Sequence, residues 1–333
     1  MSPIIRPANT DDIPSITDLL VREAEARCAI DPVLWTVAPD AAARTDHALK
    51  EALTAAHQPF RQIWQIAEQD GRIIGVLHAM CLPVPPIYAG RHGEPGLILP
   101  DSAVAPDAPD GTVDALVGSA EHALADAGAS ILLTAHVTGA TWQDVFRARS
   151  YEPLTLYLSR ADIGADIAPP DTETRPATEA DVPGIVARSA EHRRVLARID
   201  PFWETHPDAD ARFAAWMTKS LGLADRDMRV AGASPDLQGY IIAQPASRLH
   251  FPPTHDIAGT GVIDDFHHLD LADPAVTPRD GHGARALLRS AETAMAARGR
   301  RAAFVVCPAA WHSKAELLKD AGYGLAMVWS IKR

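Results

Sequence analysis

Short apolar runs alternate along the chain with longer stretches in which apolar residues recur every three or four positions. Runs rich in β-branched and aromatic residues predict strands. In the first half they cover residues 62–68, 72–80, 96–104, 131–136 and 151–159, and in the second half 228–231, 237–243, 261–271, 302–307 and 323–331. Helical periodicity predicts helices at 111–127, 141–149, 284–298 and 312–321.

The pattern occurs twice, because segments of the first half recur 168 or 169 residues later. The matching pairs are Ile5–Pro14 with Thr174–Pro183, Ile30–Pro32 with Ile199–Pro201, and Pro39-Asp40 with Pro207-Asp208. A repeat of this length is the size of a whole domain, so it indicates duplication of a domain and not a short-period solenoid.

Each copy predicts the same order of elements, β-α-α-β-β-β-α-β-α-β. Thr10 and Thr178 are candidate caps of the first helices, and Asp70-Gly71 predicts a hairpin turn. Residues 162–172 are rich in Ala, Asp and Pro and have no periodicity. The sequence therefore predicts two domains, residues 1–161 and 173–333, joined by a linker at 162–172.

Composition excludes several classes of protein. The 333 residues are 47% hydrophobic and 22% charged, with a net charge of −12, which disfavours nucleic acid and anionic membranes as partners. Three scattered cysteines have no metal-ligand spacing, so we expect no metal site. No signal region follows Met1 and no run of about 18 apolar residues occurs. We expect a cytoplasmic monomer or homodimer.

The stretch Thr260–Leu288 combines a predicted strand, a glycine-containing loop and the start of a helix. Such a loop presents backbone N–H groups at the positive end of a helix dipole, which favours anions. Arg279 and Arg285 add positive charge beside it. The pattern predicts an anion site here.

The segment Arg279-Asp280-Gly281-His282-Gly283-Ala284 resembles motif A of the GNAT-type acyl-CoA N-acyltransferases, (Arg/Gln)-x-x-Gly-x-(Gly/Ala), with His282 in place of the first Gly. The order of elements and the closing segment Ala315–Tyr323 are similar to the same family, so the resemblance covers nearly the whole chain. It implies an α/β (α+β) fold of two tandem GNAT-like domains, each a mixed, mostly antiparallel sheet flanked by helices.

The resemblance also implies acetyl-CoA as cofactor, bound by the C-terminal domain. The candidate cofactor-binding residues are Leu269, Leu271, Arg279, Asp280, Gly281, His282, Gly283, Ala284 and Arg285. The corresponding loop of the first copy, 108–113, lacks the Arg, and Asp107 and Asp110 carry charges that repel phosphate. We expect the N-terminal domain to bind coenzyme A poorly, although Asp110 could simply cap a helix.

Acyl transfer to an amine requires a base, since an alkylammonium has a pKa of about 10. Four candidates fall on the strand that the resemblance places beside the thioester: Asp264, Asp265, His267 and His268. Strand alternation puts Asp264 and His268 on one face and Asp265 and His267 on the other. Alternatively the aspartates are solvated, the histidines line a wall, and the base acts through water.

The family's usual acid, a Tyr in the last helix, is absent, because its positions hold Phe146 and Leu318. Either the thiolate leaves without a proton donor or His312 supplies the proton, unless His312 only caps the helix or lies on the surface. Trp35 and Trp203 are candidates to cover the acceptor, or else pack in the core.

Taken together, the sequence predicts an N-acetyltransferase that moves an acetyl group from acetyl-CoA to an amine of a small molecule or peptide. The alternative is a pseudoenzyme on the same fold, a CoA-binding or scaffold protein without turnover, which the missing Tyr and imperfect loops favour.

Overall fold

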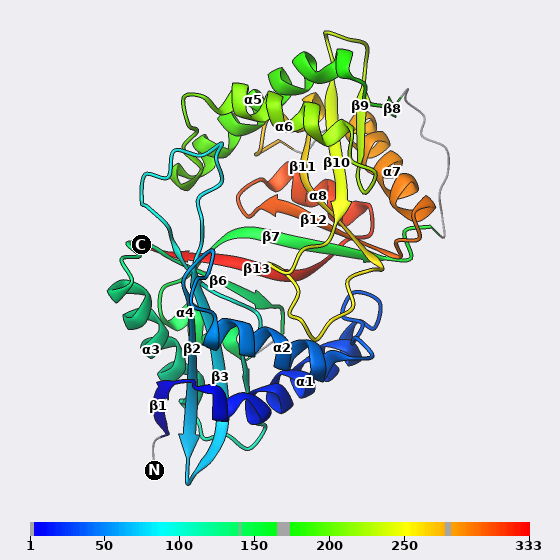
Figure 1. Cartoon of the computed structure of the whole chain (residues 1–333). Helices are drawn as coiled ribbons and strands as arrows, with labels where there is room; N and C mark the ends of the chain where they lie inside the picture. Colours follow the sequence, from blue (N-terminus) through cyan, green and yellow to red (C-terminus); the bar gives the residue numbers. More distant parts are fainter. Residues whose placement is uncertain (1–2, 140, 165–173, 277–280) are drawn as a thin grey trace.

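A computed structural model of the chain describes residues 3–139, 141–164, 174–276 and 281–333 (Figure 1). Its strands form one mixed sheet that runs through both halves of the molecule in the order β1-β2-β3-β4-β6-β13-β7-β12-β11-β10-β9-β8, with β5 paired to β3. Within the described residues, eight α-helices flank this sheet. No helix of the described part is long and apolar enough to cross a membrane.

The N-terminal half consists of the following elements. They are β1 (Ile4–Pro7), α1 (Ile13–Ile30), α2 (Ala41–Thr54), β2 (Gln62–Gln69), β3 (Arg72–Cys81), β4 (Gly96–Ile98), β5 (Ala103–Val104), α3 (Thr112–Asp126), β6 (Leu132–Val137), α4 (Trp142–Ala148) and β7 (Glu152–Ala161). Helices α1 and α2 lie on one face of these strands and α3 on the other (Figure 1).

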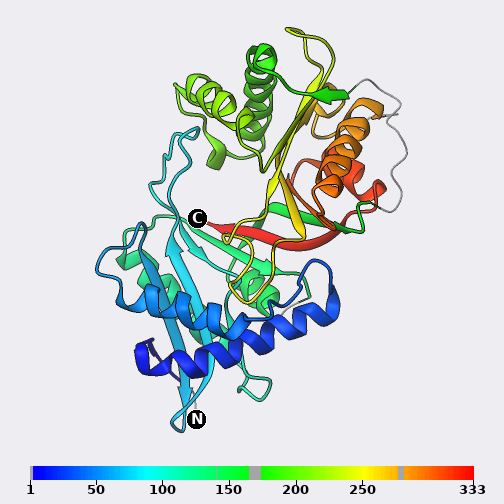
Figure 2. The ribbon, with the colours of Figure 1, turned by 45° about the vertical axis from the view of Figure 1, so that its right-hand side comes forward.

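The C-terminal half repeats the order. Its elements are β8 (Thr174–Pro176), α5 (Val182–Ile199), α6 (Ala209–Leu221), β9 (Asp227–Ala231), β10 (Gly239–Pro245), β11 (Thr260–His268), α7 (His282–Ala297), β12 (Ala302–Pro308), α8 (His312–Asp320) and β13 (Gly324–Lys332). Helices α5 and α6 face α7 across the strands β9 and β10 (Figure 2).

The repeated sequence at the start of each half is explained by one local structure. Asp12 accepts two hydrogen bonds from Arg6 and one from the backbone N–H of Asn9, and Asp181 is bonded in the same way by Arg175 and Thr178. Each forms a capping box at the first helical turn. In the first copy the cap is therefore Asn9 and not the expected Thr10.

The last strand of each half crosses into the other half. Strand β7 lies between β12 and β13, so that Tyr157 is opposite both Val306 and Met327. Strand β13 in turn pairs with β6, where Met327 is opposite Val137. The two strands cross the middle of the molecule between the two lobes (Figure 1). Sequence patterns predicted both strands but not this exchange.

The largest hydrophobic core is shared by the two halves because of this exchange. It contains Leu158 and Met327 from the exchanged strands together with Leu133 from β6 and Phe304 from β12, all fully buried. Smaller cores fill the two ends of the molecule. Neither half can complete the central core without a strand from the other.

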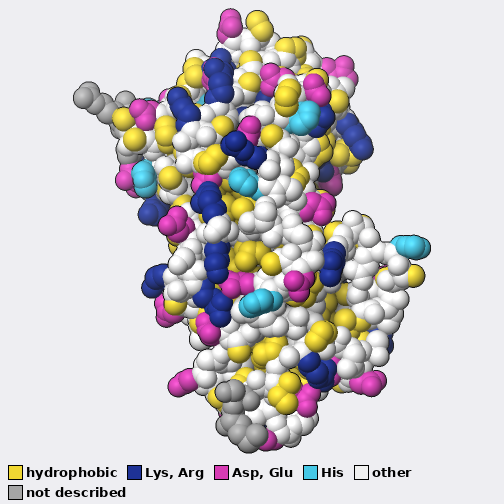
Figure 3. Space-filling view, turned by 90° about the vertical axis from the view of Figure 1, so that its left-hand side faces the viewer, with side chains coloured by type: hydrophobic (Ala, Val, Ile, Leu, Met, Phe, Trp, Pro, Cys, Tyr) yellow, Lys and Arg dark blue, Asp and Glu magenta, His cyan; other side chains and the backbone are white. Residues whose placement is uncertain are grey.

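Two loops also cross between the halves. In the loop after β3, Ala89 N donates to Glu204 O (2.7 Å) and Tyr88 bridges to Thr205. In the loop after β10, His255 of the C-terminal half forms a β-bridge with Val37 of the N-terminal half. Each half thereby covers part of the other's surface, and hydrophobic side chains are visible in the hollow between the lobes (Figure 3).

Two predicted strands differ from the observed ones. The strand expected to reach Leu271 ends at His268, because Leu269–Leu271 form a 3-10 turn that His268 caps by accepting from the Asp270 N–H. The run 96–104 is divided into β4 and β5 by an irregular segment at Leu99–Ser102. Most of the predicted linker, residues 165–172, lies outside the described residues.

We predict that the two halves unfold as one unit. Replacing the fully buried Met327 by Ala removes packing from β13 against β6 and β7, and should lower the free energy of unfolding by about 2–5 kcal/mol. Calorimetry should show a single transition at a lower temperature. Leu325→Ala, on the same strand but 44% exposed, is the matched control with little effect. Two separate transitions would contradict the shared core.

Candidate functional site

Each half contains a gap between two parallel strands that pair only at one end. Strand β4 pairs with β6 up to Ile98 opposite Thr134, and β11 pairs with β12 up to Ile263 opposite Val305. Beyond these residues the strands separate. Backbone groups that face such a gap need other partners, because buried N–H and C=O groups are costly when left unpaired.

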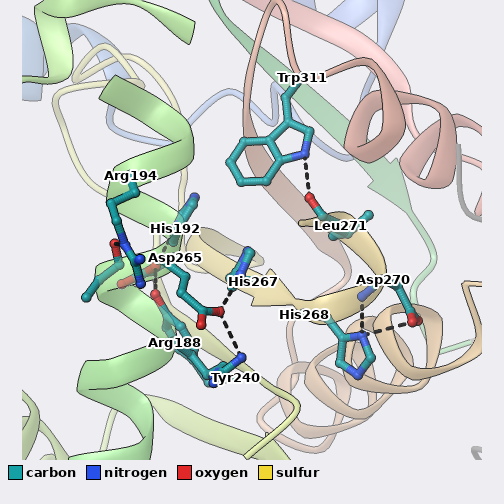
Figure 4. Close-up of polar contacts among 12 residues, drawn as sticks. Arg188, His192, Arg194, Tyr240, Asp265, His267, His268, Asp270, Leu271 and Trp311 are labelled. Atoms are coloured by element: carbon teal, nitrogen blue, oxygen red, sulfur yellow. Dashed lines mark hydrogen bonds and ion pairs between the residues drawn. The ribbon is translucent and has the colours of Figure 1, made fainter. Parts of the chain in front are cut away.

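In the C-terminal half, side chains of the chain itself fill this gap. Trp311 donates its Nε1–H to the carbonyl of Leu271 (3.1 Å), and Lys314 donates from Nζ to the carbonyl of Phe266 (3.0 Å). Both side chains are almost completely buried, and burial lowers the pKa of Lys314. Figure 4 shows the indole pointing at Leu271. The carbonyls of Phe266 in β11 and of Leu271 in the following 3-10 turn therefore already have partners.

A carboxylate also occupies the start of helix α7. The backbone N–H of Ala284, the third residue of the helix, donates to Asp270 Oδ2 (3.1 Å). His268 supports this arrangement, since its Nδ1 accepts from the Asp270 N–H (3.0 Å) (Figure 4). A Cβ at Gly283 would lie 2.3 Å from the His268 ring, so this glycine allows helix and histidine to approach closely.

The predicted cofactor-binding residues that the structure describes do not share one environment, because some are exposed, some are buried and one is ion-paired. Gly281 has φ 55° and leads into the helix, and His282 is exposed at its first position. Arg285 is paired with Asp320 (3.0 Å). Leu271 is fully buried, whereas Leu269 is 46% exposed. Arg279 and Asp280 lie outside the described residues, so this site stays a prediction.

A β-bulge changes the expected alternation along β11. Ile242 is opposite Asp265 but Ala243 is opposite Ile263, which leaves Asp264 as the extra residue. A bulge breaks the two-residue period. As a result Asp264 and Asp265 both line one cavity of about 530 Å³, called here the C-terminal cavity, whereas alternation predicted opposite faces.

The two aspartates have different protonation behaviour. Enclosure by protein, with the charge of Asp265 adding to it, raises the pKa of Asp264 to about 7, although its carboxylate is accessible to solvent within the cavity. Burial acts in the same direction on Asp265, but hydrogen bonds from His192 Nδ1 (3.1 Å) and the Tyr240 hydroxyl outweigh it and lower its pKa. Figure 4 shows this cluster.

The predicted histidines do not line the C-terminal cavity. His267 is completely buried, stacks on His192 with ring centroids 5.5 Å apart, and has its pKa lowered to about 2 by burial. His268 holds the start of α7, and His312 is exposed at the first position of α8. Trp203 lines the cavity, whereas Trp35 packs on Phe251 with ring centroids 5.2 Å apart.

In the N-terminal half the gap opens into a groove of about 430 Å³, called here the N-terminal groove. It is lined by the start of α3, the end of β6 and the start of α4, and Gly139 forms part of its wall. Gly139 and Trp311 both lie in the turn that precedes the last helix of their half, 11 residues before the left-handed turn residue, Ser150 or Gly322. The smallest residue in one half thus replaces the largest in the other.

The loop at this groove is less negative than its sequence indicates. Asp107 makes two hydrogen bonds of 2.7 Å with Arg72, and Asp114 is paired with Arg149 (2.7 Å). Asp110 remains at the groove wall. Helix α3 begins after Gly111, which has φ 86° and provides no side-chain cap.

On the far side of the same strands lies a histidine–aspartate pair that no sequence pattern indicated. His78 Nδ1 is 2.7 Å from Asp101 Oδ2, and the His78 ring stacks on Trp64 with centroids 3.9 Å apart. Both residues of the pair line a cavity of about 770 Å³, called here the N-terminal cavity. His78 Nε2 has no hydrogen-bond partner among the described residues.

The pair could have been found only through the duplication. Asp101 follows the strand β4 as Asp265 follows the bulge in β11, and both contact a residue of the preceding strand, His78 or Tyr240.

A small cavity of about 10 Å³ lies between the N-terminal groove and the N-terminal cavity. It shares the lining residue Leu99 with the cavity and Arg27 with the groove.

Comparison with solved structures identifies the fold. The chain is similar to a GCN5-related N-acetyltransferase from Sphaerobacter thermophilus over 99% of this chain and 95% of that one (TM-score 0.58, 17% identity). It is also similar to a tandem GNAT protein from the clavulanic acid biosynthesis pathway, over 99% and 98% (TM-score 0.51, 14% identity). No protein-family model and no curated protein matches the sequence. The predicted tandem GNAT fold is confirmed.

The raised pKa of Asp264 predicts a pH-dependent effect on stability. Between the unfolded pKa of about 4 and the folded pKa of about 7, the unfolded chain is ionised while the folded chain keeps the proton, so rising pH destabilises the fold. Asp264→Asn removes this loss, and its melting temperature relative to the parent should be higher at pH 8 than at pH 5. Asp236→Asn, an exposed control, should show no such trend.

Proposed function

We propose that the protein is an acyl-CoA-dependent N-acyltransferase, with acetyl-CoA in the N-terminal groove and an amine of a small molecule or peptide in the N-terminal cavity. One observation carries the proposal: a groove of about 430 Å³ lies beside Gly139, and the His78–Asp101 pair lines a cavity on the other side of the strands. Between them lie a cavity of about 10 Å³ and the buried Arg27, which donates to the Pro100 carbonyl (2.7 Å). The corresponding gap of the C-terminal half is filled by Trp311 and Lys314.

The residues of the N-terminal groove suit the parts of coenzyme A. Backbone N–H groups at the start of α3 lie at the positive end of the helix, which favours a pyrophosphate. Gly139 adds no bulk to the groove. The space between the separated strands is only about 10 Å³, so an extended chain with amide groups requires Arg27 to move from the Pro100 carbonyl. Arg72 and Arg149 neutralise two of the nearby aspartates, which reduces repulsion of the phosphates.

His78 is suited to accept the proton of the amine once a substrate reaches its Nε2, which is buried and has no hydrogen-bond partner among the described residues. If its Nδ1–H donates to Asp101, its Nε2 carries the lone pair and the carboxylate stabilises the positive charge that develops. The neutral amine then forms a C–N bond with the thioester carbon, the C–S bond breaks, and the second proton that the nitrogen loses passes to the departing thiolate, directly or through water. Backbone N–H groups of the separated strand are available to the oxyanion. The thiolate can leave without an acid, since its pKa is about 8.5.

The pseudoenzyme interpretation is favoured for the C-terminal half by specific contacts. The carbonyl of Phe266 in β11 is bonded to Lys314, that of Leu271 in the following 3-10 turn is bonded to Trp311, and the start of α7 is bonded to Asp270. A thioester and a pyrophosphate would have to displace all three side chains. The prediction that this half binds acetyl-CoA is therefore kept as an outcome of the next experiment.

Coenzyme A binding should depend on Gly139. Gly139→Trp places in the groove the side chain that fills the opposite gap, and binding measured by calorimetry should be lost. Gly139→Ala controls for the backbone, because φ 79° strains any residue but glycine whereas a Cβ there meets nothing within 4 Å. His282→Glu adds a negative charge at the exposed start of α7 and should leave binding intact.

The reverse result would place the cofactor in the C-terminal half. Lost binding in His282→Glu with normal binding in Gly139→Trp contradicts the proposal and supports the assignment made from sequence. Substitution of Gly283 cannot make this distinction, since a side chain there collides with His268 whether or not a cofactor binds.

Turnover should depend on the His78–Asp101 pair. His78→Gln should lower kcat by about a hundredfold or more while coenzyme A binding is unchanged, and Asp101→Asn should lower it through the wrong imidazole tautomer. Release of the free thiol from acetyl-CoA over an amine panel measures both. His122→Gln, an exposed histidine on α3, is the control. Parental turnover in His78→Gln, or coenzyme A binding without turnover in the parent, would overturn the assignment.

A further inference from the structure

We propose that the C-terminal cavity is a second binding site, which takes an organic cation with an aromatic or other apolar body and does not acylate it. The site is separate from the groove and cavity proposed for acyl transfer. Its volume of about 530 Å³ is that of a small-molecule site. Both halves of the chain form its walls.

Aromatic side chains supply most of the wall. They come from α5–α6 and the turn between them, from the exchanged strands and from the loop after β3: Trp203, Phe213, Trp216, Tyr157, Trp329 and Tyr88. Trp216 is 37% exposed at the cavity and packs against Phe213, with ring centroids 6.0 Å apart. Aromatic faces attract cations as well as apolar groups.

The loop that carries Tyr88 is fixed across the cavity by backbone contacts between the two halves. His206 N donates to Ile87 O (3.0 Å), and Arg212 donates to Pro86 O (2.7 Å). The enclosure therefore depends on main-chain contacts of the folded protein. A ligand in this cavity would be surrounded by both halves.

The cations of the wall are engaged by other groups. Arg193 is hydrogen-bonded to Asp210 and to Ser189 (2.6 Å), and Arg212 is paired with Asp208 (3.4 Å). Lys314 donates to the Phe266 carbonyl deep in the strand gap. These contacts direct the positive groups of the wall away from an incoming ligand.

The two carboxylates of the wall, Asp264 and Asp265, differ in how fully they are paired. Asp265 has Tyr240 and His192 as partners, whereas Asp264 accepts from the amide of Gln244 (2.6 Å) and from its own backbone N–H. A neutral amide does not balance a carboxylate charge. The charge of Asp264 is thus the unmatched one, and a cation beside it is the complementary ligand.

Acylation of this ligand is excluded by the filling of the neighbouring strand gap. The Lys314 ammonium and the Trp311 indole occupy the carbonyls along which a thioester arm would have to extend. The cavity keeps its walls and its charge but has no path for the acyl donor. Binding without chemistry follows.

The test uses 2-phenylethylammonium as probe and 2-phenylethanol as its neutral isostere, with calorimetry at pH 8 and no coenzyme A. The full-length Asp101→Asn protein serves as parent, because it removes the carboxylate that pairs with His78 in the N-terminal cavity. We expect the amine to bind at least tenfold more tightly than the alcohol. Asp264→Asn should abolish this preference, whereas the exposed Asp236→Asn should keep it.

A second variant keeps the test informative even if Asp264→Asn fails to fold. Trp216→Ala, at the partly exposed end of the wall, should weaken binding of both probes about equally. Equal affinity for amine and alcohol, or an amine preference that survives Asp264→Asn, would overturn the proposal. Acetyl transfer to the probe by the Gly139→Trp protein would show that this half is catalytic, and would also overturn it. Loss of turnover in His78→Gln leaves the probe result unaffected, so the two proposals fail separately.

Discussion

The insertion of β7 between β12 and β13 is the constraint on which the rest of the structure depends. A strand inserted in this way is hydrogen-bonded on both edges to the second half, while α4, which precedes it, belongs to the first. The two halves are consequently held in a fixed relation. That relation brings the loop with Tyr88 over the C-terminal cavity and the loop with Leu249 over the N-terminal cavity. Both cavities are properties of the pair and not of a single half.

Within this shared frame, a few side chains give the two halves different chemistry. Gly139 and Trp311 lie in the corresponding turns before α4 and α8, yet one lines a groove and the other donates to the Leu271 carbonyl of the 3-10 turn after β11. Helix α3 begins without a side-chain cap at Gly111, whereas Asp270 reaches a backbone N–H of α7. Duplicated folds need not duplicate sites, because binding depends on the side chains that fill or leave the gap.

Sequence predicted the elements and the duplication because periodicity and capping are local. The Arg–Asp capping unit, Arg6 with Asp12, recurs in sequence because it recurs in structure. The strand exchange was not predictable in this way, since a buried strand such as β7 has the same pattern whichever neighbours it has. The bulge at Asp264 arises because β11 has one residue more than β10 in the paired stretch. This difference cannot be seen in the sequence of either strand alone. The His78–Asp101 contact joins two unremarkable positions 23 residues apart, which only the fold brings together.

Charge counted along the sequence and charge arranged in space lead to different expectations for the two halves. The loop at 107–114 contains three aspartates, but Arg72 and Arg149 reach two of them from distant segments. The loop at the start of α7 has the basic residue Arg285, but Asp320 pairs with it and Asp270 occupies a helix N–H. An anion site needs donors that are free as well as positive. By that criterion the acidic loop at 107–114 borders the helix start whose N–H groups have no carboxylate partner among the described residues. For this reason we assign coenzyme A to the groove beside Gly139 and not to the motif at Gly281–Ala284.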